Sequence, residues 1–257
     1  MRYLLSVRRQ KPLALFLDYD GTLVPIAPTP AEAVPSPELL TALQKCALRP
    51  DTRITIISGR PMEQLKEFFS SLPICLVAEH GGEILCQGEE LAGPFPMSQE
   101  EEKARQEFFQ YAEKLFGSLL AEKPEKYRGI WLERKKRTLA CHFRLAAEEG
   151  AAEFLERWKE KVSPFLAPLK LEFLPGKKVL EIRPAYMNKG AAVEYLMTLW
   201  PEAYPVFIGD DVTDEDVFLR LSAKGLTIRV GLEGETSARY RLAGPAEVLR
   251  LLQGLEG

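Results

Sequence analysis

The sequence is poor in histidine and cysteine, with two and four residues among 257. The four cysteines lie far apart and include no Cys-x-x-Cys pair, so we expect reduced, mostly buried thiols rather than a disulfide framework or a zinc site. With so few imidazoles, any bound metal is expected to be a hard ion on carboxylates. The cysteines are Cys46, Cys75, Cys86 and Cys141.

An excess of positive charge is also absent. Lys and Arg number 34 against 37 Asp and Glu, a formal charge of -3, which leaves no basic field for nucleic acid. No apolar run approaches the roughly 20 residues that span a bilayer. The basic start, Met1 to Lys11, is followed by an apolar run that stops at Asp18, too early for a signal peptide. We therefore expect a cytoplasmic protein that acts on neither nucleic acid nor membrane. A monomer is a separate expectation, which these features do not decide.

Short apolar runs alternate with helical segments at both ends of the chain. Helices are expected from about Pro37 and from Pro61, because proline suits the first helical position. Wholly apolar strands between helices are typical of a parallel sheet covered on both faces, so these regions predict an α/β fold. The expected strands are 13–17, 53–57, 74–78, 205–208 and 227–230.

The middle of the chain has a different pattern. A helix over 100–120 precedes strands 130–133 and 139–144; a helix over 147–165 precedes strands 169–173 and 179–183, with a turn at Pro175-Gly176. This order predicts an inserted α+β module with an antiparallel sheet. Asn188 then caps the next helix. We expect a core of residues 1–98 and 185–257, interrupted by a cap domain over 99–184.

Polar side chains follow three of the expected parallel strands. Asp18 and Asp20 end the first, Ser58 follows the second, and Asp210 follows a later one. Each residue alone could be a turn or a helix cap. In open parallel sheets, however, ligands bind outside the carboxyl ends of the strands, so the repetition favours a common site.

The carboxylates of this site predict a metal. Asp18 and Asp20 are two residues apart, and Asp210 and Asp214 add further negative charge that a cation would neutralise. Oxygen ligands with room for water suit Mg²⁺. A carboxylate beside such an ion can approach an anionic phosphorus.

Two further residues favour a phosphate ligand. Ser58 offers a hydroxyl just before a helix N-terminus, where free backbone N–H groups attract anions. Lys189 supplies a positive charge at the start of another helix. A metal, a lysine, a hydroxyl and a nucleophile together predict phosphoryl transfer.

These residues resemble the motifs of the haloacid dehalogenase (HAD) superfamily. Asp18-Tyr19-Asp20-Gly21-Thr22-Leu23 looks like motif I, and Ser58, Lys189 and Gly209-Asp210-Asp211 match motifs II, III and IV in order. Three shorter segments and the string 209–218 are similar to trehalose-6-phosphate phosphatases; the segments are 78–81, 132–135 and 179–184. The resemblance spans about Leu13 to Phe218. It implies a HAD-like Rossmannoid core with a parallel sheet and an inserted α+β cap of the C2B type.

The resemblance implies the following chemistry. Asp18 would be the nucleophile that forms an aspartyl-phosphate, and Asp20 the general acid and then base. Lys189 would restrain Asp18 and, with Ser58 and Gly59, bind the phosphoryl oxygens.

The metal ligands are implied in the same way. Mg²⁺ would be held by Asp18, the backbone carbonyl of Asp20 and Asp210, with Asp214 as a further ligand or as the partner of one. Asp216 is instead expected to form a capping box with Thr213.

In the cap, the resemblance places substrate contacts at Glu133, Lys135 and Glu181, with Arg183 as a weaker candidate. Glu133 and Lys135 are two apart on one strand and so share a face; a merely solvated charged strand is the alternative. His142 is expected only to sit on its strand. Trp131, Trp158 and Trp200 are expected to be packing residues.

The resemblance implies a Mg²⁺-dependent phosphatase that converts trehalose 6-phosphate to trehalose and inorganic phosphate. No synthase-like segment precedes the motifs, so we expect a stand-alone enzyme. Alternatives on the same scaffold are phosphatases for sucrose, glucosylglycerol or mannosylglycerate phosphates and a phosphohexomutase. A catalytically silent sugar-phosphate sensor is the alternative from another class.

Overall fold

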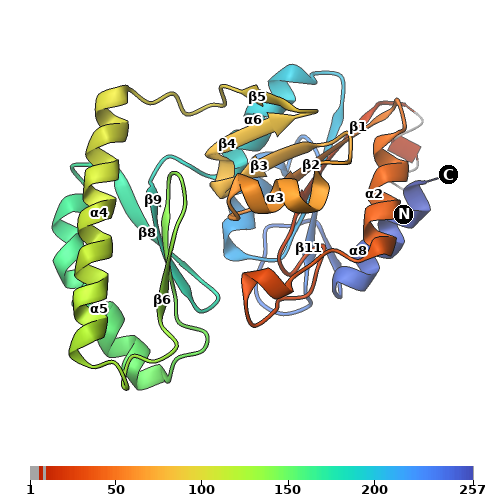
Figure 1. The fold of residues 1–257 in the computed structure, drawn as a ribbon. Helices are drawn as coiled ribbons and strands as arrows, with labels where there is room; N and C mark the ends of the chain where they lie inside the picture. The colour runs from red at the N-terminus through yellow and green to blue at the C-terminus, as the bar shows by residue number, and fades with distance from the viewer. Residues whose placement is uncertain (1–5, 8–9, 257) are drawn as a thin grey trace. The chain divides into compact units, whose positions relative to one another are not determined.

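The computed structural model describes residues 6–7 and 10–256. The chain forms two compact units: unit 1 comprises Met1–Pro94 and Asn188–Gly257, and unit 2 comprises Phe95–Met187. Figure 1 draws unit 2 as the yellow-green to cyan part of the ribbon, and in the sequence this unit separates the two segments of unit 1.

Unit 1 is built on an eight-stranded sheet in the order β12-β11-β10-β1-β2-β3-β4-β5. The strands from β12 to β3 are parallel, whereas β4 and β5 are antiparallel to their neighbours. The strands are β1 (Leu13–Asp18), β2 (Thr52–Ile57), β3 (Cys75–Ala78), β4 (Glu83–Cys86), β5 (Glu89–Leu91), β10 (Tyr204–Gly209), β11 (Leu226–Val230) and β12 (Tyr240–Leu242).

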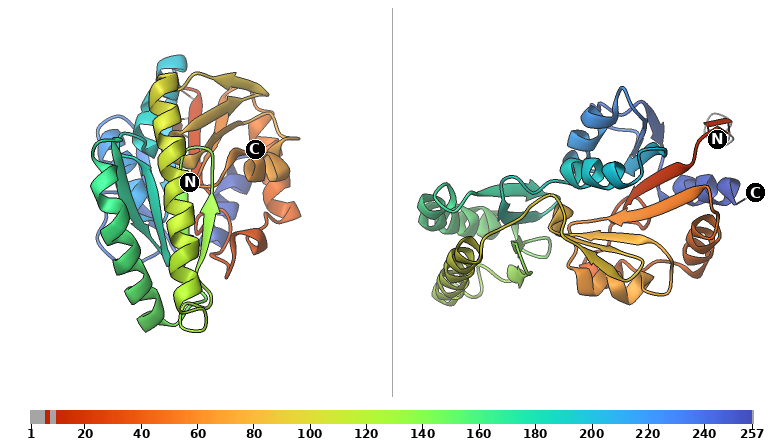
Figure 2. Two further views of the ribbon diagram at one scale, coloured as in Figure 1. Left: turned by 60° about the vertical axis from the view of Figure 1, so that its left-hand side comes forward. Right: turned by 90° about the horizontal axis from the view of Figure 1, so that it is seen from above.

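Helices cover both faces of this sheet, which confirms the predicted α/β architecture (Figure 2). Leu15 of β1 belongs to the core with α2 (Pro37–Ala47), α3 (Met62–Phe69) and α8 (Pro245–Leu255). Phe16, next in sequence, belongs to the core with α6 (Lys189–Leu199) and α7 (Glu215–Leu221). Because successive side chains point to opposite faces, a strand between two cores must be apolar throughout. The described part of this unit also contains three short 3₁₀ helices: Pro30–Glu32, Glu79–Gly81 and Val212–Asp214.

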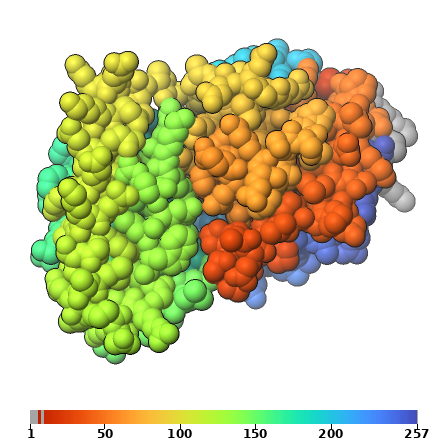
Figure 3. All heavy atoms as spheres, viewed as in Figure 1, coloured from red at the N-terminus to blue at the C-terminus, as the bar shows by residue number. Residues whose placement is uncertain are grey.

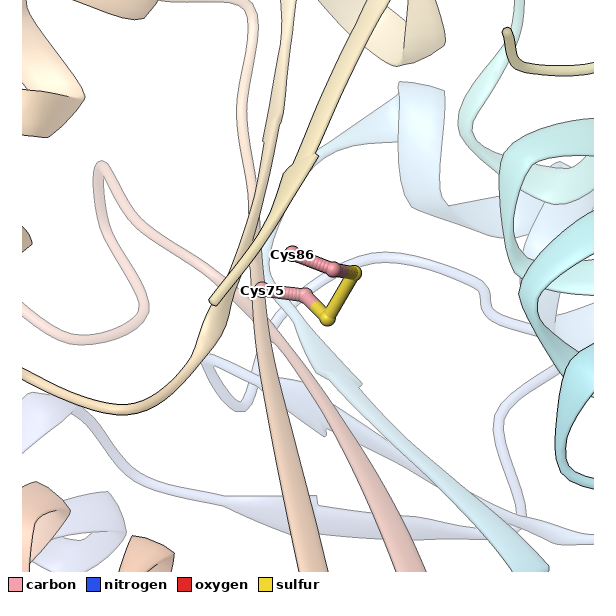
Figure 4. Close-up of a disulfide and its surroundings, with 2 residues drawn as sticks. All are labelled: Cys75 and Cys86. Carbon is pink, nitrogen blue, oxygen red and sulfur yellow. A yellow bond between two sulfur atoms is a disulfide. The ribbon is translucent and has the colours of Figure 1, made fainter. Parts of the chain in front are cut away.

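A disulfide in unit 1 corrects the expectation that all four cysteines are free. Cys75 and Cys86 are directly opposite each other on β3 and β4 and are bonded through their sulfur atoms (Figure 4). The sequence does not reveal this pair, because the two residues meet only when β4 folds back after the turn at Glu79–Gly81. Cys46 and Cys141 are outside disulfides and buried, as expected.

Unit 2 has the predicted order of helix, two strands, helix, two strands. Its antiparallel sheet has the order β6-β7-β9-β8. One boundary differs: β8 runs through Pro175 and Gly176, which pair with β9, so the turn lies at Lys177-Lys178. The elements are α4 (Gln99–Glu122), β6 (Trp131–Arg134), β7 (Leu139–His142), α5 (Glu148–Leu166), β8 (Leu171–Gly176) and β9 (Val179–Pro184).

Both helices of unit 2 pack on one face of its sheet (Figures 1 and 2). The core includes Phe109 of α4, Trp158 of α5, and Cys141 and Ile182 of the sheet. Gln106 of α4 also hydrogen-bonds the backbone carbonyl oxygen of Lys136, and Figure 3 shows α4 beside this β6–β7 turn. By strand alternation, the other face of the sheet carries the residues between these core positions. In the described part of the chain, no helix is long and apolar enough to cross a membrane.

Candidate active site

The carboxyl ends of three neighbouring strands of unit 1 carry the candidate core residues. Asp18 is the last residue of β1 and is paired with Ile57 of β2, so that Ser58 follows at the same edge. β10 pairs with β1 on the other side, and Asp210 follows its last residue. Asp18, Ser58 and Asp210 are all buried.

A buried lysine joins two of the carboxylates. Nζ of Lys189 lies 2.7 Å from Oδ1 of Asp18 and 2.7 Å from Oδ1 of Asp214. Lys189 is the first residue of α6, and the preceding Asn188 caps this helix by accepting a hydrogen bond from Ala191 N–H. The cap confirms the predicted helix start and fixes the position of the lysine.

The charges of this cluster depend on one another. Burial raises the pKa of Asp18 well above its usual value, and the negative charges of Asp214 and Asp210 raise it further, against the opposing effect of Lys189. Burial disfavours the charged form of Lys189, but the two carboxylates outweigh burial and raise its pKa. The lysine therefore stays protonated, whereas ionisation of Asp18 is disfavoured.

The site fits a divalent cation. Carboxylate oxygens of Asp18, Asp210 and Asp214 all lie within 4.8 Å of one another. Among the described residues, Oδ2 of Asp18 is buried and has no hydrogen-bond partner. An unpaired buried carboxylate oxygen is costly unless a cation or ligand satisfies it. Three converging acidic oxygens are the donor set that hard cations prefer.

Gly21 allows the chain to pass close to this cluster. It has a φ of +88°, and the Cβ of any side chain there would clash with the carboxylate of Asp210. Only glycine adopts this conformation without strain and also leaves room for the carboxylate.

Asp214 has a second role that corrects the predicted capping box. The box is formed by Asp211 and Asp214: Oδ2 of Asp214 accepts a hydrogen bond of 2.9 Å from Asp211 N–H. Asp216 instead pairs with Arg220, 2.9 Å away. One oxygen of Asp214 thus accepts a hydrogen bond from the backbone and the other accepts one from Lys189. These two hydrogen bonds fix the carboxylate in the cluster.

The carboxylate of Asp20 contacts Arg60, a residue that the sequence analysis missed. Arg60 contacts both oxygens of Asp20 at 2.7 Å, a bidentate pair. The guanidinium is buried and lies over the ring of Tyr19, 4.8 Å from its centroid. Arg60 stands in the Ser-Gly-Arg segment after β2, and its place two residues after Ser58, at the same strand end, was the available signal. The pair fixes the orientation of the Asp20 carboxylate; metal binding through the Asp20 carbonyl stays a prediction.

The segment after β2, Ser58-Gly59-Arg60, is closely packed. The Ser58 hydroxyl accepts a hydrogen bond from Arg60 N–H at 3.2 Å. A Cβ on Gly59 would lie 2.5 Å from the His80 ring, so only glycine fits. The phosphate-binding roles of Ser58 and Gly59 stay predictions.

In unit 2, the predicted substrate residues form linked polar pairs. Nζ of Lys135 lies 2.9 Å from Oε1 of Glu181, which also accepts a hydrogen bond from the Thr138 hydroxyl at 2.6 Å. Glu133 pairs with His142 at 2.9 Å, so His142 does more than occupy its strand. Burial disfavours ionisation of Glu133, but the hydrogen bond to His142 and the charge of Lys135 outweigh it and lower the pKa.

Arg183, the weaker candidate, donates to Oε1 of Glu172 from both Nε and Nη2, at 3.0 and 2.9 Å. Neither residue is among the Glu133, Lys135 and Glu181 pairs described above. Its role in substrate binding stays a prediction.

Comparison with known proteins gives consistent findings. The trehalose-phosphatase family model matches residues 16–246. A trehalose 6-phosphate phosphatase of Zea mays is 34% identical over 98% of this chain and 72% of its own length. A bifunctional trehalose-6-phosphate synthase/phosphatase of Thermoproteus tenax is 34% identical over 96% of this chain, which spans 32% of that protein.

A solved structure is similar over the whole of this chain. The C-terminal domain of Candida albicans trehalose-6-phosphate phosphatase has a TM-score of 0.79 and 28% sequence identity, and the match covers 100% of this chain and 96% of that one. This similarity confirms the predicted fold class, a HAD-like core with a separate antiparallel cap.

Proposed function

We propose that this chain, which belongs to the trehalose-phosphatase family, hydrolyses trehalose 6-phosphate to trehalose and inorganic phosphate, the final step of trehalose biosynthesis. One observation carries the proposal. Asp18 is buried at a strand end with Oδ1 held by Lys189 and with Oδ2 unpaired among the described residues. A carboxylate whose orientation is fixed, and which has one oxygen without a hydrogen bond, is suited to attack phosphorus.

In the first step, an oxygen of Asp18 forms a bond to phosphorus while the bond from phosphorus to the sugar oxygen breaks. Lys189 orients the Asp18 carboxylate by its 2.7 Å hydrogen bond. In its protonated form, Asp20 gives a proton to the leaving sugar oxygen. That form cannot accept from Arg60 at both oxygens, so one hydrogen bond of the pair has to open before this step. The products of this step are trehalose and the aspartyl-phosphate.

In the second step, Asp20 takes a proton from water as the water oxygen attacks phosphorus, and the bond to Asp18 breaks. Inorganic phosphate leaves and the carboxylate is restored. Ser58, Gly59 and Lys189 bind the phosphoryl oxygens in both steps.

Asp18, Asp210 and Asp214 are the residues that would hold Mg²⁺, together with the Asp20 carbonyl. When bound, the ion supplies positive charge that lets Asp18 ionise and approach an anionic phosphate. The convergence of one carboxylate oxygen from each of the three side chains, all within 4.8 Å of one another, supports this assignment.

Unit 2 selects the sugar in this proposal. The paired Glu133, Lys135 and Glu181 offer charged acceptors and a donor for sugar hydroxyls, and Arg183 offers another donor. We also propose that the protein is a cytoplasmic monomer that acts on a small molecule and on neither nucleic acid nor membrane.

Phosphate release by the purified protein tests the function. Trehalose 6-phosphate, sucrose 6-phosphate, glucose 6-phosphate and glucosylglycerol phosphate are assayed with Mg²⁺ and with EDTA. We expect a strong preference for trehalose 6-phosphate and loss of activity in EDTA that added Mg²⁺ restores. A preference for another sugar would keep the chemistry and reject the substrate. Binding without turnover on every substrate would indicate a sensor, and a requirement for an activating bisphosphate a mutase.

Glu133→Ala is expected to raise KM for trehalose 6-phosphate roughly 10- to 100-fold, because a hydrogen bond to a charged group contributes about 1.5–3 kcal/mol. KM for acetyl phosphate, which has no sugar, should change far less. Steady-state kinetics with both substrates measures the difference. Glu148→Ala, at an exposed position of the same unit, is the control. Equal effects of Glu133→Ala on the two substrates would reject Glu133 as a sugar contact.

A further inference from the structure

Trp131 and His142 form a stacked pair in unit 2. They are directly opposite each other on β6 and β7, with ring centroids 3.9 Å apart and an interplanar angle of 9°. Trp131 therefore differs from Trp158, which is fully buried in the core under α4 and α5. The expectation that all three tryptophans are packing residues is wrong for Trp131.

The indole of Trp131 has an exposed surface and an N–H donor that is free among the described residues. Trp131 is 37% exposed, although His142 covers one face of its ring. No described residue accepts a hydrogen bond from its Nε1–H. Tryptophan is enriched at binding surfaces because it offers a large apolar ring together with an N–H donor.

Strand alternation places this ring among the polar pairs described above. Leu132 and Cys141 contact the helix-covered core, so Trp131, Glu133 and His142 lie on the opposite face of the sheet. Glu133 fixes the His142 ring through the 2.9 Å contact, and His142 in turn supports the indole. The orientation of Trp131 is thus set by neighbours rather than left to solvent.

We propose that Trp131 binds the sugar of the substrate by stacking, a role that rests on the proposed function. A pyranose ring has an apolar face of C–H groups and a rim of hydroxyls. The exposed part of the indole matches the C–H face, and Nε1–H can donate to a hydroxyl oxygen. The carboxylate of Glu133, on the same face, accepts from the rim. A charged strand that is merely solvated requires no aromatic ring held in this way.

The test compares variants at Trp131 with a matched control. Trp131→Ala is expected to raise KM for trehalose 6-phosphate roughly 10-fold, in the range of aromatic stacking, with kcat little changed. Trp131→Phe should retain most of the affinity because it keeps a ring. Tyr111→Ala removes a ring that is 43% exposed on α4, and we expect wild-type KM. KM for acetyl phosphate should respond far less to Trp131→Ala than KM for the sugar phosphate.

A binding measurement separates stacking from a loss of structure. In an Asp18→Asn background, trehalose 6-phosphate should change the tryptophan fluorescence, and Trp131→Phe should remove that change while the thermal unfolding midpoint stays the same. An unchanged KM in Trp131→Ala, or the same KM change in Tyr111→Ala, would overturn the stacking role. Hydrolysis of trehalose 6-phosphate by the wild type would still support the proposed function in that case. Absence of that hydrolysis in the wild type would reject both.

Discussion

Asp18→Asn is expected to reduce kcat for trehalose 6-phosphate by roughly 10⁴-fold or more, since losses of this size follow removal of a nucleophile. The amide has nearly the shape of the carboxylate but cannot attack phosphorus at a useful rate. Phosphate release at high enzyme concentration measures the residual rate.

The same substitution should leave the fold intact. Burial and the charges of Asp214 and Asp210 already disfavour the ionised form of Asp18, so a neutral group at this position relieves repulsion. Lys189 keeps Asp214 as its second partner at 2.7 Å. We therefore expect a thermal unfolding midpoint no lower than that of the wild type.

Asp51→Asn, in an ion pair with Arg49 before β2, is the matched control and should retain wild-type kcat. Appreciable phosphate release by a freshly purified Asp18→Asn variant would contradict the assignment of Asp18 as the nucleophile. A lowered unfolding midpoint would instead show that the carboxylate is needed for the fold.

The parts of the site that the sequence predicted are those fixed by strand ends and helix starts. Asp18 and Asp210 follow apolar strands, and Lys189 follows a helix cap, so the parallel sheet alone brings them to one edge. Their positions in the sequence were enough to predict the site, because the strand ends and the helix start determine where the Cα atoms of these residues lie.

The parts that were missed depend on side-chain pairing between distant segments. Arg60 meets Asp20 across 40 residues, and nothing in the spacing indicates which acidic residue it contacts. Cys75 and Cys86 meet through the hairpin of β3 and β4, which the sequence analysis did not anticipate. The stack of Trp131 on His142 likewise depends on the register of β6 and β7. Strand register depends on the hydrophobic pattern together with the geometry of the turn, and side-chain rotamers depend on packing, so the spacing of residues along the chain does not by itself identify these pairs.

Lys189→Met is expected to lower both activity and stability. Lys189 lies between two buried carboxylates, and removal of one partner of a buried ion pair typically costs about 3–5 kcal/mol. Without the lysine, Asp18 and Asp214 repel each other, and Asp18 loses the interaction that favours its ionised form. We expect kcat to fall roughly 10²- to 10³-fold or more, because a fixed charge on the phosphoryl oxygens is also lost.

Urea unfolding and steady-state kinetics separate the two effects. Lys103→Met, which removes an exposed lysine of α4, should change neither. The double variant Lys189→Met/Asp214→Asn should recover part of the lost stability, since it removes one of the two repelling charges, but should not recover kcat. If the single variant unfolds like the wild type, the three groups do not form the buried charge cluster described above. If the double variant recovers kcat as well, Lys189 acts only by neutralising Asp214, and its role at Asp18 and at the phosphoryl group is rejected.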